Sequence, residues 1–325
     1  MGLRSYLQQL TSSTIWYGSN ANRTTFSAAT ITGGTVTAAG ISPGNGYRYH
    51  VFTSPGTLTV SDGSRNIEYL VIASGGGGGT GTGGGGGAGG VRNGTLSVSS
   101  PQSITVGPAP GVRYNGTSAL NGSPSIFGSI VSQGGGAGAS GSPGGTRNVA
   151  NPGGSGGGGG FYPGGYMPGA TAGGSGNKET GTSTPAPTQG NNGATHPGAD
   201  GGSGGGGAGG AGSAGPMGAG GPGSPFPGFA APLISPEIPS PVRTAWTTAV
   251  GPTGLYGGGG AGSIGAVSYA TPAPGGGGVN GGGGGAYATS GVDYTGSGGG
   301  ANWTYSPDAY GGSGGAGIVI IRYLI

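Results

Sequence analysis

Few side chains in this sequence could carry out acid–base or nucleophilic chemistry, and those few are scattered. The acidic residues are Asp62, Glu68, Glu179, Asp200, Glu237, Asp293 and Asp308. No two of them are three or four positions apart, the spacing that would bring two carboxylates to one face of a helix. General acid–base and covalent catalysis both need groups held beside one another. We therefore expect no catalytic residues and a protein that is not an enzyme.

Sites for metals, nucleotides and other cofactors are not predicted either. The chain has no cysteine, and its two histidines, His50 and His196, lack zinc-binding spacing. Lys178 follows Asn177 instead of the glycine that a phosphate-binding loop requires. We expect His50 to be a solvent-exposed residue of a strand, and His196 to lie without a partner in a polar loop. No cofactor and no metal are expected.

The charge pattern does not favour nucleic acid or membrane partners. Ten Lys plus Arg against seven Asp plus Glu leave a net charge of +3, and the arginines form no cluster that matches a row of phosphates. The longest aliphatic stretch, residues 318–325, is too short to cross a bilayer and contains Arg322. The first ten residues lack the apolar core of a secretory signal. We expect a cytoplasmic product that neither binds nucleic acid nor inserts into a membrane.

Aromatic residues are the side chains best suited to bind a partner, because Tyr and Trp stack on sugar rings and pack into protein grooves. The candidate contacts fall into three groups: Phe161, Tyr162 and Tyr166; then Phe226, Phe229 and Trp246; then Trp303, Tyr305 and Tyr310, preceded by Tyr294. The alternative is that these rings cap the ends of the fold or fill a subunit interface. Residues 222–243 contain seven prolines, and we expect a stiffened loop there that serves in subunit contact.

The elements that position these groups begin with strands at residues 47–73. Residues 47–53 alternate, 57–60 follow a Ser-Pro-Gly turn, and 67–73 are almost entirely apolar, which predicts an antiparallel meander with a buried last strand. Two shorter strands are expected within 95–107. Residues 317–325 form a second apolar, β-branched run, and we expect it to pair with 67–73. The chain between these two strands would then begin and end on neighbouring strands of one framing sheet.

The intervening chain, about 75–316, is dominated by glycine runs. Each glycine loses about 1–2 kcal/mol of backbone freedom on folding and buries no side chain, so hydrogen bonds must stabilise the segment if it folds. An extended helix with three residues per turn points its N–H and C=O groups outward, toward neighbours that approach closely where no Cβ intervenes. Runs such as 75–79 and 83–87 suit the interior of such a bundle. We therefore predict a polyglycine-II-like bundle; the alternatives are a glycine-rich sheet, an irregular coil or a disordered low-complexity chain.

Residues 1–42 are expected to form a separate arm ahead of a domain that covers 43–325. Leu3, Tyr6, Leu7 and Leu10 have helical spacing, and residues 28–38 resemble a small hairpin that turns at Gly33 and Gly34. A unit of this size is too small to be stable alone. We expect it to anchor the protein on a partner or on copies of itself; the alternative is an arm folded onto its own domain.

Several short stretches resemble a known family. They are Phe52-Thr-Ser-Pro-Gly-Thr-Leu-Thr-Val60, Ile67-Glu-Tyr-Leu-Val-Ile-Ala-Ser-Gly-Gly-Gly-Gly-Gly79, Ile104-Thr-Val-Gly107 and Gly317-Ile-Val-Ile-Ile-Arg-Tyr323. Their order is similar to the glycine-rich domain of bacteriophage tail fibres and adhesins, notably in phages of marine and cyanobacterial hosts. The resemblance covers about residues 47–325. The proline-rich residues 222–243, and Pro108-Ala-Pro after Gly107, depart from the family's pattern.

This resemblance implies a virion protein, often a homotrimer, with a role in fibres or host contact. We thus expect a mainly β and irregular fold, in which a small antiparallel framing sheet closes the glycine bundle behind a short N-terminal helix and hairpin. The expected function is a non-enzymatic tail fibre or tail-associated adhesin, joined to other virion proteins through residues 1–42 and to a host glycan or protein through its aromatic residues. A capsid decoration or head-fibre protein, and a glycine-rich ice-binding or matrix protein, are the alternatives.

Overall fold

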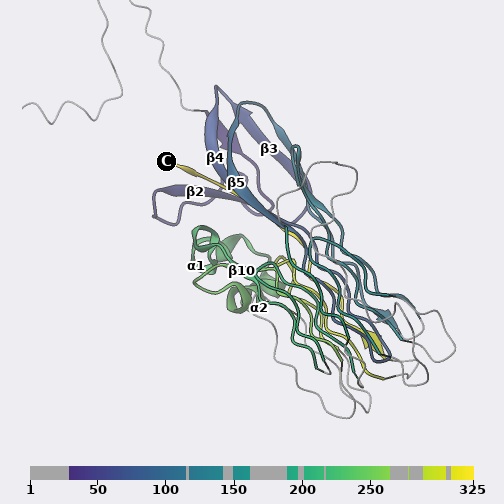
Figure 1. Ribbon diagram of the computed structural model, residues 1–325. Helices are drawn as coiled ribbons and strands as arrows, with labels where there is room; N and C mark the ends of the chain where they lie inside the picture. The colour runs from purple at the N-terminus through teal and green to yellow at the C-terminus, as the bar shows by residue number, and fades with distance from the viewer. Residues whose placement is uncertain are drawn as a thin grey trace, which may run out of the picture.

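The structure is a computed structural model that describes residues 29–114, 117–141, 149–161, 189–196, 201–215, 217–263, 277, 288–304 and 309–325. The helix expected near Leu3–Leu10 lies outside these residues. The described chain divides into β-sheets and short helices at one end and a bundle of glycine-rich segments at the other (Figure 1). The fold is mainly β, with few helices, as expected.

A four-stranded antiparallel sheet joins the two apolar runs of the sequence. Its strands are β2 (Tyr47–Phe52), β13 (Ile318–Leu324), β4 (Arg65–Ile72) and β5 (Val91–Val98), in that spatial order. β13 pairs with β4 from Ile318 opposite Ile72 to Arg322 opposite Glu68, which confirms the expected pairing. On its other edge β13 pairs with β2. The glycine region therefore starts and ends on adjacent strands.

Both faces of this sheet are covered, which explains why β4 and β13 are nearly continuous in apolar residues. Val319, Ile321 and Tyr323 of β13 point into a core shared with the second sheet. The alternate residues Ile318 and Ile320 point into a core shared with the helices. All five of these side chains are buried. A polar residue at either set of positions would therefore face an apolar layer.

The second sheet has five antiparallel strands in the order β1-β3-β6-β8-β9. They are β1 (Thr30–Thr32), β3 (Gly56–Ser61), β6 (Gln102–Thr105), β8 (Ser125–Phe127) and β9 (Ile130–Ser132). The expected strands thus form, but the expected meander is wrong, because β3 lies in this sheet while β2 and β4 lie in the other. β3 buries Leu58 and Val60 in the core between the two sheets, and β13 occupies the edge of β2. Pairing set by burial has overridden pairing between sequence neighbours.

The hairpin expected at 28–38 is also wrong. β1 pairs with β3, with Thr30 opposite Ser61, and Ile31 is buried in the core between the sheets. Residues 35–38 form no strand, and the Thr35 amide donates to the Val51 carbonyl at 2.9 Å. Residues 29–41, assigned above to the arm, therefore pack on the domain. The Ile31 side chain is removed from water more completely in this core than it would be in an isolated two-stranded hairpin.

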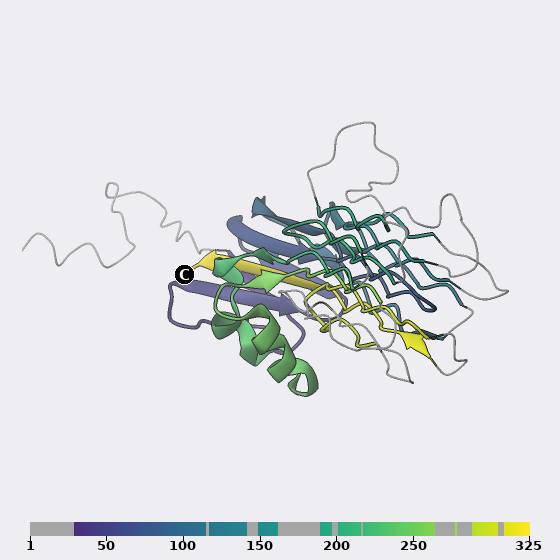
Figure 2. The ribbon, with the colours of Figure 1, turned by 60° about the horizontal axis from the view of Figure 1, so that its bottom comes forward.

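Residues 222–243 do not form the expected loop but contribute most of a helical layer. It contains β10 (Ser224–Pro225), η2 (Pro227–Phe229), α1 (Ala231–Ile234), η3 (Ser235–Glu237), α2 (Ser240–Val250) and β11 (Leu255–Tyr256), and it lies against the four-stranded sheet (Figure 2). Each of these helices has a proline in its first two positions, where no helical N–H bond is lost. The prolines start helices instead of stiffening a loop.

The glycine segments are joined by backbone hydrogen bonds whose partners repeat every three residues. Within 75–79 the amides of Gly75 and Gly78 donate to Gly315 and Gly312, those of Gly76 and Gly79 donate to Gly87 and Gly84, and that of Gly77 donates to Leu120. Each step of three along this segment moves three residues along the neighbour. This is the pattern of an extended helix with three residues per turn, surrounded by similar helices. The described bundle is neither a sheet nor an irregular coil.

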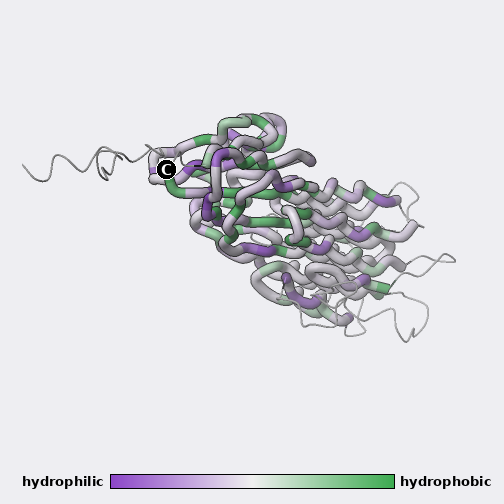
Figure 3. The backbone as a smooth tube through the Cα atoms, turned by 90° about the horizontal axis from the view of Figure 1, so that it is seen from above, coloured by the Kyte–Doolittle hydropathy of each residue, from purple (hydrophilic) through white to green (hydrophobic). Residues whose placement is uncertain are grey.

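Residues 83–90 form the centre of the bundle. Their amides donate in rotation to the segments 296–302, 133–139 and 203–206, and their carbonyls accept from 76–79, 155–158 and 260–263. Six neighbours thus surround this segment. A Cβ added to Gly86 would lie 2.0 Å from the Gly76 carbonyl oxygen, so side chains are excluded there by backbone. The tube in Figure 3 is accordingly pale along the bundle, with the strongly apolar positions gathered at the sheet end.

Candidate functional site

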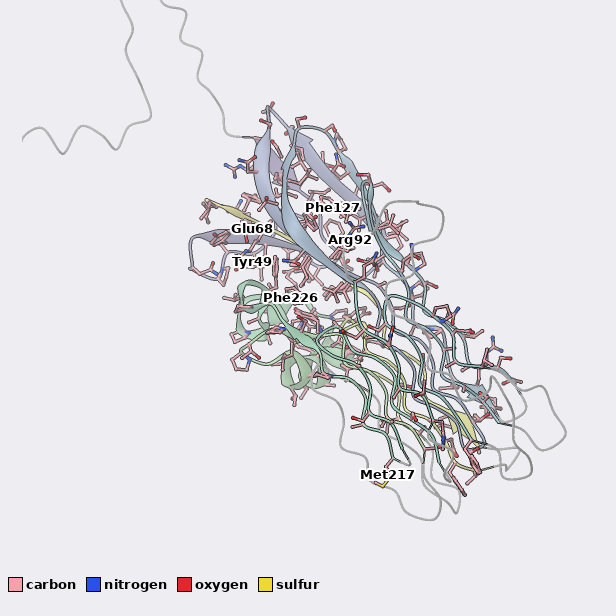
Figure 4. The ribbon with its side chains drawn as sticks, viewed as in Figure 1. Tyr49, Glu68, Arg92, Phe127, Met217 and Phe226 are labelled. Carbon is pink, nitrogen blue, oxygen red and sulfur yellow. The ribbon has the colours of Figure 1, made fainter. Side chains whose placement is uncertain are left out.

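The turn at residues 80–82 lies at the end of the bundle away from the sheets. The Thr82 amide donates to the Trp303 carbonyl at 3.1 Å, and the Phe161 amide donates to the Thr82 carbonyl at 3.1 Å. The Ser263 amide donates to the Gly83 carbonyl at 3.1 Å. Three segments that are far apart in the sequence therefore meet beside residues 80–83. We call this end of the molecule the tip; it points to the lower right in Figure 4.

The turn at residues 80–82 holds the tip together. Gly81 and Thr82 both have φ of 59°, a left-handed conformation that glycine adopts freely and threonine rarely does. The Thr82 hydroxyl donates to the Gly81 carbonyl at 2.5 Å and contacts the Phe161 carbonyl. The Thr80 carbonyl accepts from the Gly141 amide at 3.0 Å. These local bonds compensate the strained residue and join the turn to the segments that contain Gly141 and Phe161.

Aromatic residues from two of the three sequence groups meet at the tip. The Phe161 ring lies 5.3 Å from the His196 ring, and Trp303 is half-buried beside the 80–82 turn. Tyr310 of β12 (Tyr310–Gly311) is opposite Tyr114 of β7 (Arg113–Tyr114), and their rings form an edge-to-face pair at 5.9 Å. Tyr114 is 55% exposed. The sequence did not single out Tyr114, because no other aromatic residue lies within ten positions of it.

This arrangement suits binding through ring faces. In the described part of the chain, no three His, Cys, Asp or Glu residues gather where a metal ion could bind. His196 is not the unpaired loop residue that was expected: its Nε2 lies 2.9 Å from the Gly201 carbonyl, and burial lowers its pKa. The tip therefore presents aromatic and polar groups together with the exposed Arg113, and Tyr114 is its most exposed aromatic ring.

The second aromatic group is not at the tip, and two of its members are core residues. Trp246 is completely buried under α2, where its Nε1 donates to the Tyr294 carbonyl at 3.0 Å, and Phe229 is 6% exposed. The prediction that they contact a receptor is wrong for this reason. Phe226 is half-buried against Tyr256, and Tyr294 packs on the same core, which separates it from Trp303 and Tyr310. Tyr162, Tyr166 and Tyr305 lie outside the described residues.

The structure also corrects the expectation that His50 is exposed to solvent. It is completely buried between the two sheets, not exposed, and its Nδ1 lies 2.6 Å from the Gly33 carbonyl oxygen. Its ring stacks on Tyr323 at 5.7 Å, and its Nε2 has no hydrogen-bond partner among the described residues. Burial lowers the pKa of His50, the Gly33 bond opposes that shift, and the positive charge of Arg48 adds to it. His50 is a structural residue that holds the 33–41 segment.

A comparison with protein families agrees with this architecture. Residues 52–324 match the sequence pattern of a glycine-rich domain. The chain belongs to this glycine-rich domain family. The matched part of the glycine-rich domain runs from the last residue of β2 to the last residue of β13, and so includes the bundle, the helical layer and the tip. No curated protein matches the chain. None of the helices in the described ranges is long and apolar enough to span a membrane.

Proposed function

We propose that this glycine-rich domain protein is a non-enzymatic structural component of a bacteriophage particle, most consistent with a tail fibre or a tail-associated adhesin. One observation carries the proposal: the two ends of the molecule are different. The described chain begins at Ala29 beside the sheets, whereas the ends of the glycine segments, with their aromatic residues, lie at the opposite end. A protein with this layout can be held at one end and present the other.

In this proposal, residues 1–42 join the protein to other virion proteins, and the chain assembles as a homo-oligomer, with a trimer favoured by the family resemblance. The part of this segment that packs on the domain, residues 29–41, gives the attachment a rigid base, since Ile31 is buried and the Thr37 amide donates to the buried Glu237 at 2.9 Å. The protein is made in the host cytoplasm and then carried on the particle.

The tip is the proposed host-contact surface, and a surface glycan or protein of the host is the proposed partner. Tyr114, Tyr310, Trp303 and Phe161 support this assignment, because aromatic faces bind sugars and protein grooves without needing charge. Neither a cofactor, nor nucleic acid, nor membrane insertion enters the proposal. A capsid decoration or head-fibre protein with a purely structural role is the main alternative. An ice-binding or matrix protein is the third.

The experiment has two arms on the phage particle that carries this chain. Antibody label is expected at the tail, and the purified protein is expected to compete with particles for adsorption to the host. The double variant Tyr114→Ala/Tyr310→Ala should lose most of this competition, while Val36→Ala, a change at an exposed apolar residue of the sheet end, should keep it. Label over the capsid with unaffected adsorption would favour the decoration role and remove the adhesin role.

A further inference from the structure

The four-stranded sheet splits into two pairs of strands at its end away from the bundle. The ladder between β13 and β4 stops at Arg322 opposite Glu68. Beyond that pair, β13 stays with β2 up to Leu324, and β4 stays with β5 back to Arg65. Figure 1 shows β2 turning away from β4 and β5 here. A groove of about 500 Å³ occupies the gap, which we call the sheet fork.

The two strands that face the fork have backbone groups available for another strand. The Ala73 amide donates toward β5 and the Ile325 amide donates toward the β2 side. Because backbone groups alternate in direction along a strand, Asn66 of β4 and Leu324 of β13 face each other across the fork. They would form the next pair of the ladder, and the ladder does not reach them. Open strand edges of this kind accept extended peptides.

The side chains around the fork combine apolar and polar character. Leu96 is 38% exposed and Leu324 is 66% exposed, and both line the groove. Glu68 lies at its base, where a single carboxylate oxygen, Oε2, accepts both bonds from Arg322 at 2.6 and 3.0 Å. The other oxygen of Glu68 has no hydrogen bond within the described ranges. Thr95 and Ser97 add hydroxyl groups. The fork therefore fits an extended segment with apolar and uncharged polar side chains, because Arg322, which also lines the groove, already neutralises Glu68.

We propose that an extended stretch of this chain's own N-terminal residues, centred on Thr14–Tyr17, occupies the sheet fork as an added strand, which leaves the other residues of 1–42 for the attachment proposed above. Within residues 1–28, Thr14-Ile-Trp-Tyr17 is the run richest in β-branched and aromatic residues, the types that favour strands. Residues 14–17 carry no charge, which suits a groove in which Glu68 is already paired with Arg322.

The place where the described chain begins also favours this occupant. β1 starts at Thr30 opposite Ser61 of β3, and the turn after Ser61 leads into Arg65 and Asn66 at the fork. Ala29 thus lies at the same end of the molecule as the groove. The connection from residue 17 to residue 29 can span about 40 Å at roughly 3.3 Å per residue. Strands about 4.8 Å apart and sheets about 10 Å apart are well within that reach.

Photo-crosslinking of the full chain tests the proposal. A benzoylphenylalanine replaces Leu96 in one variant and Leu324 in a second, and the crosslinked peptides are identified by mass spectrometry. Crosslinks to residues 10–20 are expected from both positions. The control replaces Val149, which is 50% exposed and follows a bundle segment, and should not crosslink to residues 10–20. Crosslinks from the fork to other parts of the chain, or none at all, would overturn the proposal.

A mixture of isotope-labelled and unlabelled protein identifies which copy supplies the strand. Crosslinked peptide pairs that are both labelled or both unlabelled would show that the strand comes from the same chain. Pairs of one labelled and one unlabelled peptide would show that a second copy fills the fork, against the proposal. As a measurement without a photoprobe, Ile15→Asp/Trp16→Asp in the full chain should raise the amide-exchange rates of residues 66 and 324 at least about tenfold. Unchanged rates at both residues would also contradict the proposal. Neither experiment depends on phage adsorption, so its outcome is separate from that of the host-contact role.

Discussion

At the scale of single residues, the bundle is limited by the room available for a Cβ. Ala88 is the one residue of 83–90 with a side chain, and it is completely buried. Its Cβ lies near Gly257, 3.6 Å from where a Cβ on that glycine would be, and so meets no backbone carbonyl there. Elsewhere in the bundle most added Cβ atoms would meet a backbone carbonyl. Whether a glycine can be replaced by alanine therefore depends on the direction in which its Cβ would point, and not on how deeply the glycine is buried.

Two adjacent glycines test this statement. A Cβ on Gly76 would lie 2.2 Å from the Gly136 carbonyl oxygen, whereas the nearest atom to a Cβ on Gly77 is 3.5 Å away. Gly76→Ala should lower the free energy of unfolding by about 3 kcal/mol or more, since backbone has to move. Gly77→Ala should change it by less than about 1 kcal/mol and in the stabilising direction, because alanine restricts the unfolded chain. Chemical denaturation of both variants checks the prediction; equal effects would contradict it.

His50 gives the stability of the protein a defined pH dependence. Its pKa in the folded state lies below the ordinary value of 6.5, so below about pH 6.5 the unfolded chain binds a proton that the folded chain does not. The free energy of unfolding is therefore highest above that pH and falls as the pH drops toward the folded-state pKa, by at most about 1.4 kcal/mol per pH unit. His50→Gln should flatten this part of the curve. Urea titrations between pH 7 and pH 5 compare the two proteins, and parallel curves would rule out His50 as the cause.

At the scale of elements, the helical layer is attached to the sheet by a few specific contacts. Arg322 of β13 donates to the Gly228 carbonyl at 2.8 Å and packs its guanidinium over the Phe229 ring at 5.0 Å. Tyr256 of β11 is completely buried and donates to the Phe229 carbonyl at 2.8 Å. Burial raises the pKa of Tyr256 well above its ordinary value, so its hydroxyl stays a donor at neutral pH. The layer is thus part of the apolar core and not an appendage.

Trp246 should be the residue on which this layer depends most. Trp246→Ala removes a completely buried indole and its bond to the Tyr294 carbonyl, so we expect a loss of about 3–5 kcal/mol in the free energy of unfolding. The exposed neighbour Thr247→Ala should change it by less than about 0.5 kcal/mol. Thermal melts followed by near-ultraviolet circular dichroism provide the measurement. A small effect of Trp246→Ala would show that the layer packs loosely.

The pairing of β4 with β13 could be predicted because only two runs in the sequence are apolar and β-branched throughout. The division of β2 and β3 between two sheets could not, since each strand alone fits either partner and only the shared core decides. The helices were missed although residues 229–250 contain no glycine and α2 begins with Ser-Pro. The burial of Trp246 and Phe229 could not be predicted without this helical layer. The place of Tyr114 in the candidate site could not be predicted either, because Tyr114 pairs with Tyr310, a residue almost 200 positions later in the sequence.

At the scale of the whole molecule, two different interiors are joined end to end. Between the sheets and under the helices, apolar side chains are removed from water, the usual source of stability. In the bundle the interior consists of backbone, and each central amide has a carbonyl partner on another segment. The second interior is directional, because each bond requires its neighbour to be in register.

Amide exchange should show that the backbone interior is as well protected as the apolar one. We expect amides of residues 84–89 to exchange at least about 10⁴ times more slowly than in an unfolded chain, similar to those of β13 and β4. The amide of the exposed Val112, for which the structure shows no hydrogen bond within the described residues, should exchange much faster. Mass spectrometry or NMR at pH 7 provides the comparison. Rapid exchange throughout 84–89 would mean that the bundle opens without unfolding the sheets.

The position of β13 in the sequence determines when these interiors can form during synthesis. The ribosome completes β2 and β4 early but makes their shared neighbour β13 only after the glycine segments that bond to one another. Until then β2 lacks its strand partner and β4 is paired on its β5 edge alone, and contacts so distant in sequence form slowly. Unpaired strands of this kind associate with other nascent chains. Yield of the folded protein should therefore respond to growth temperature and chaperone supply more than to the stability of the finished fold.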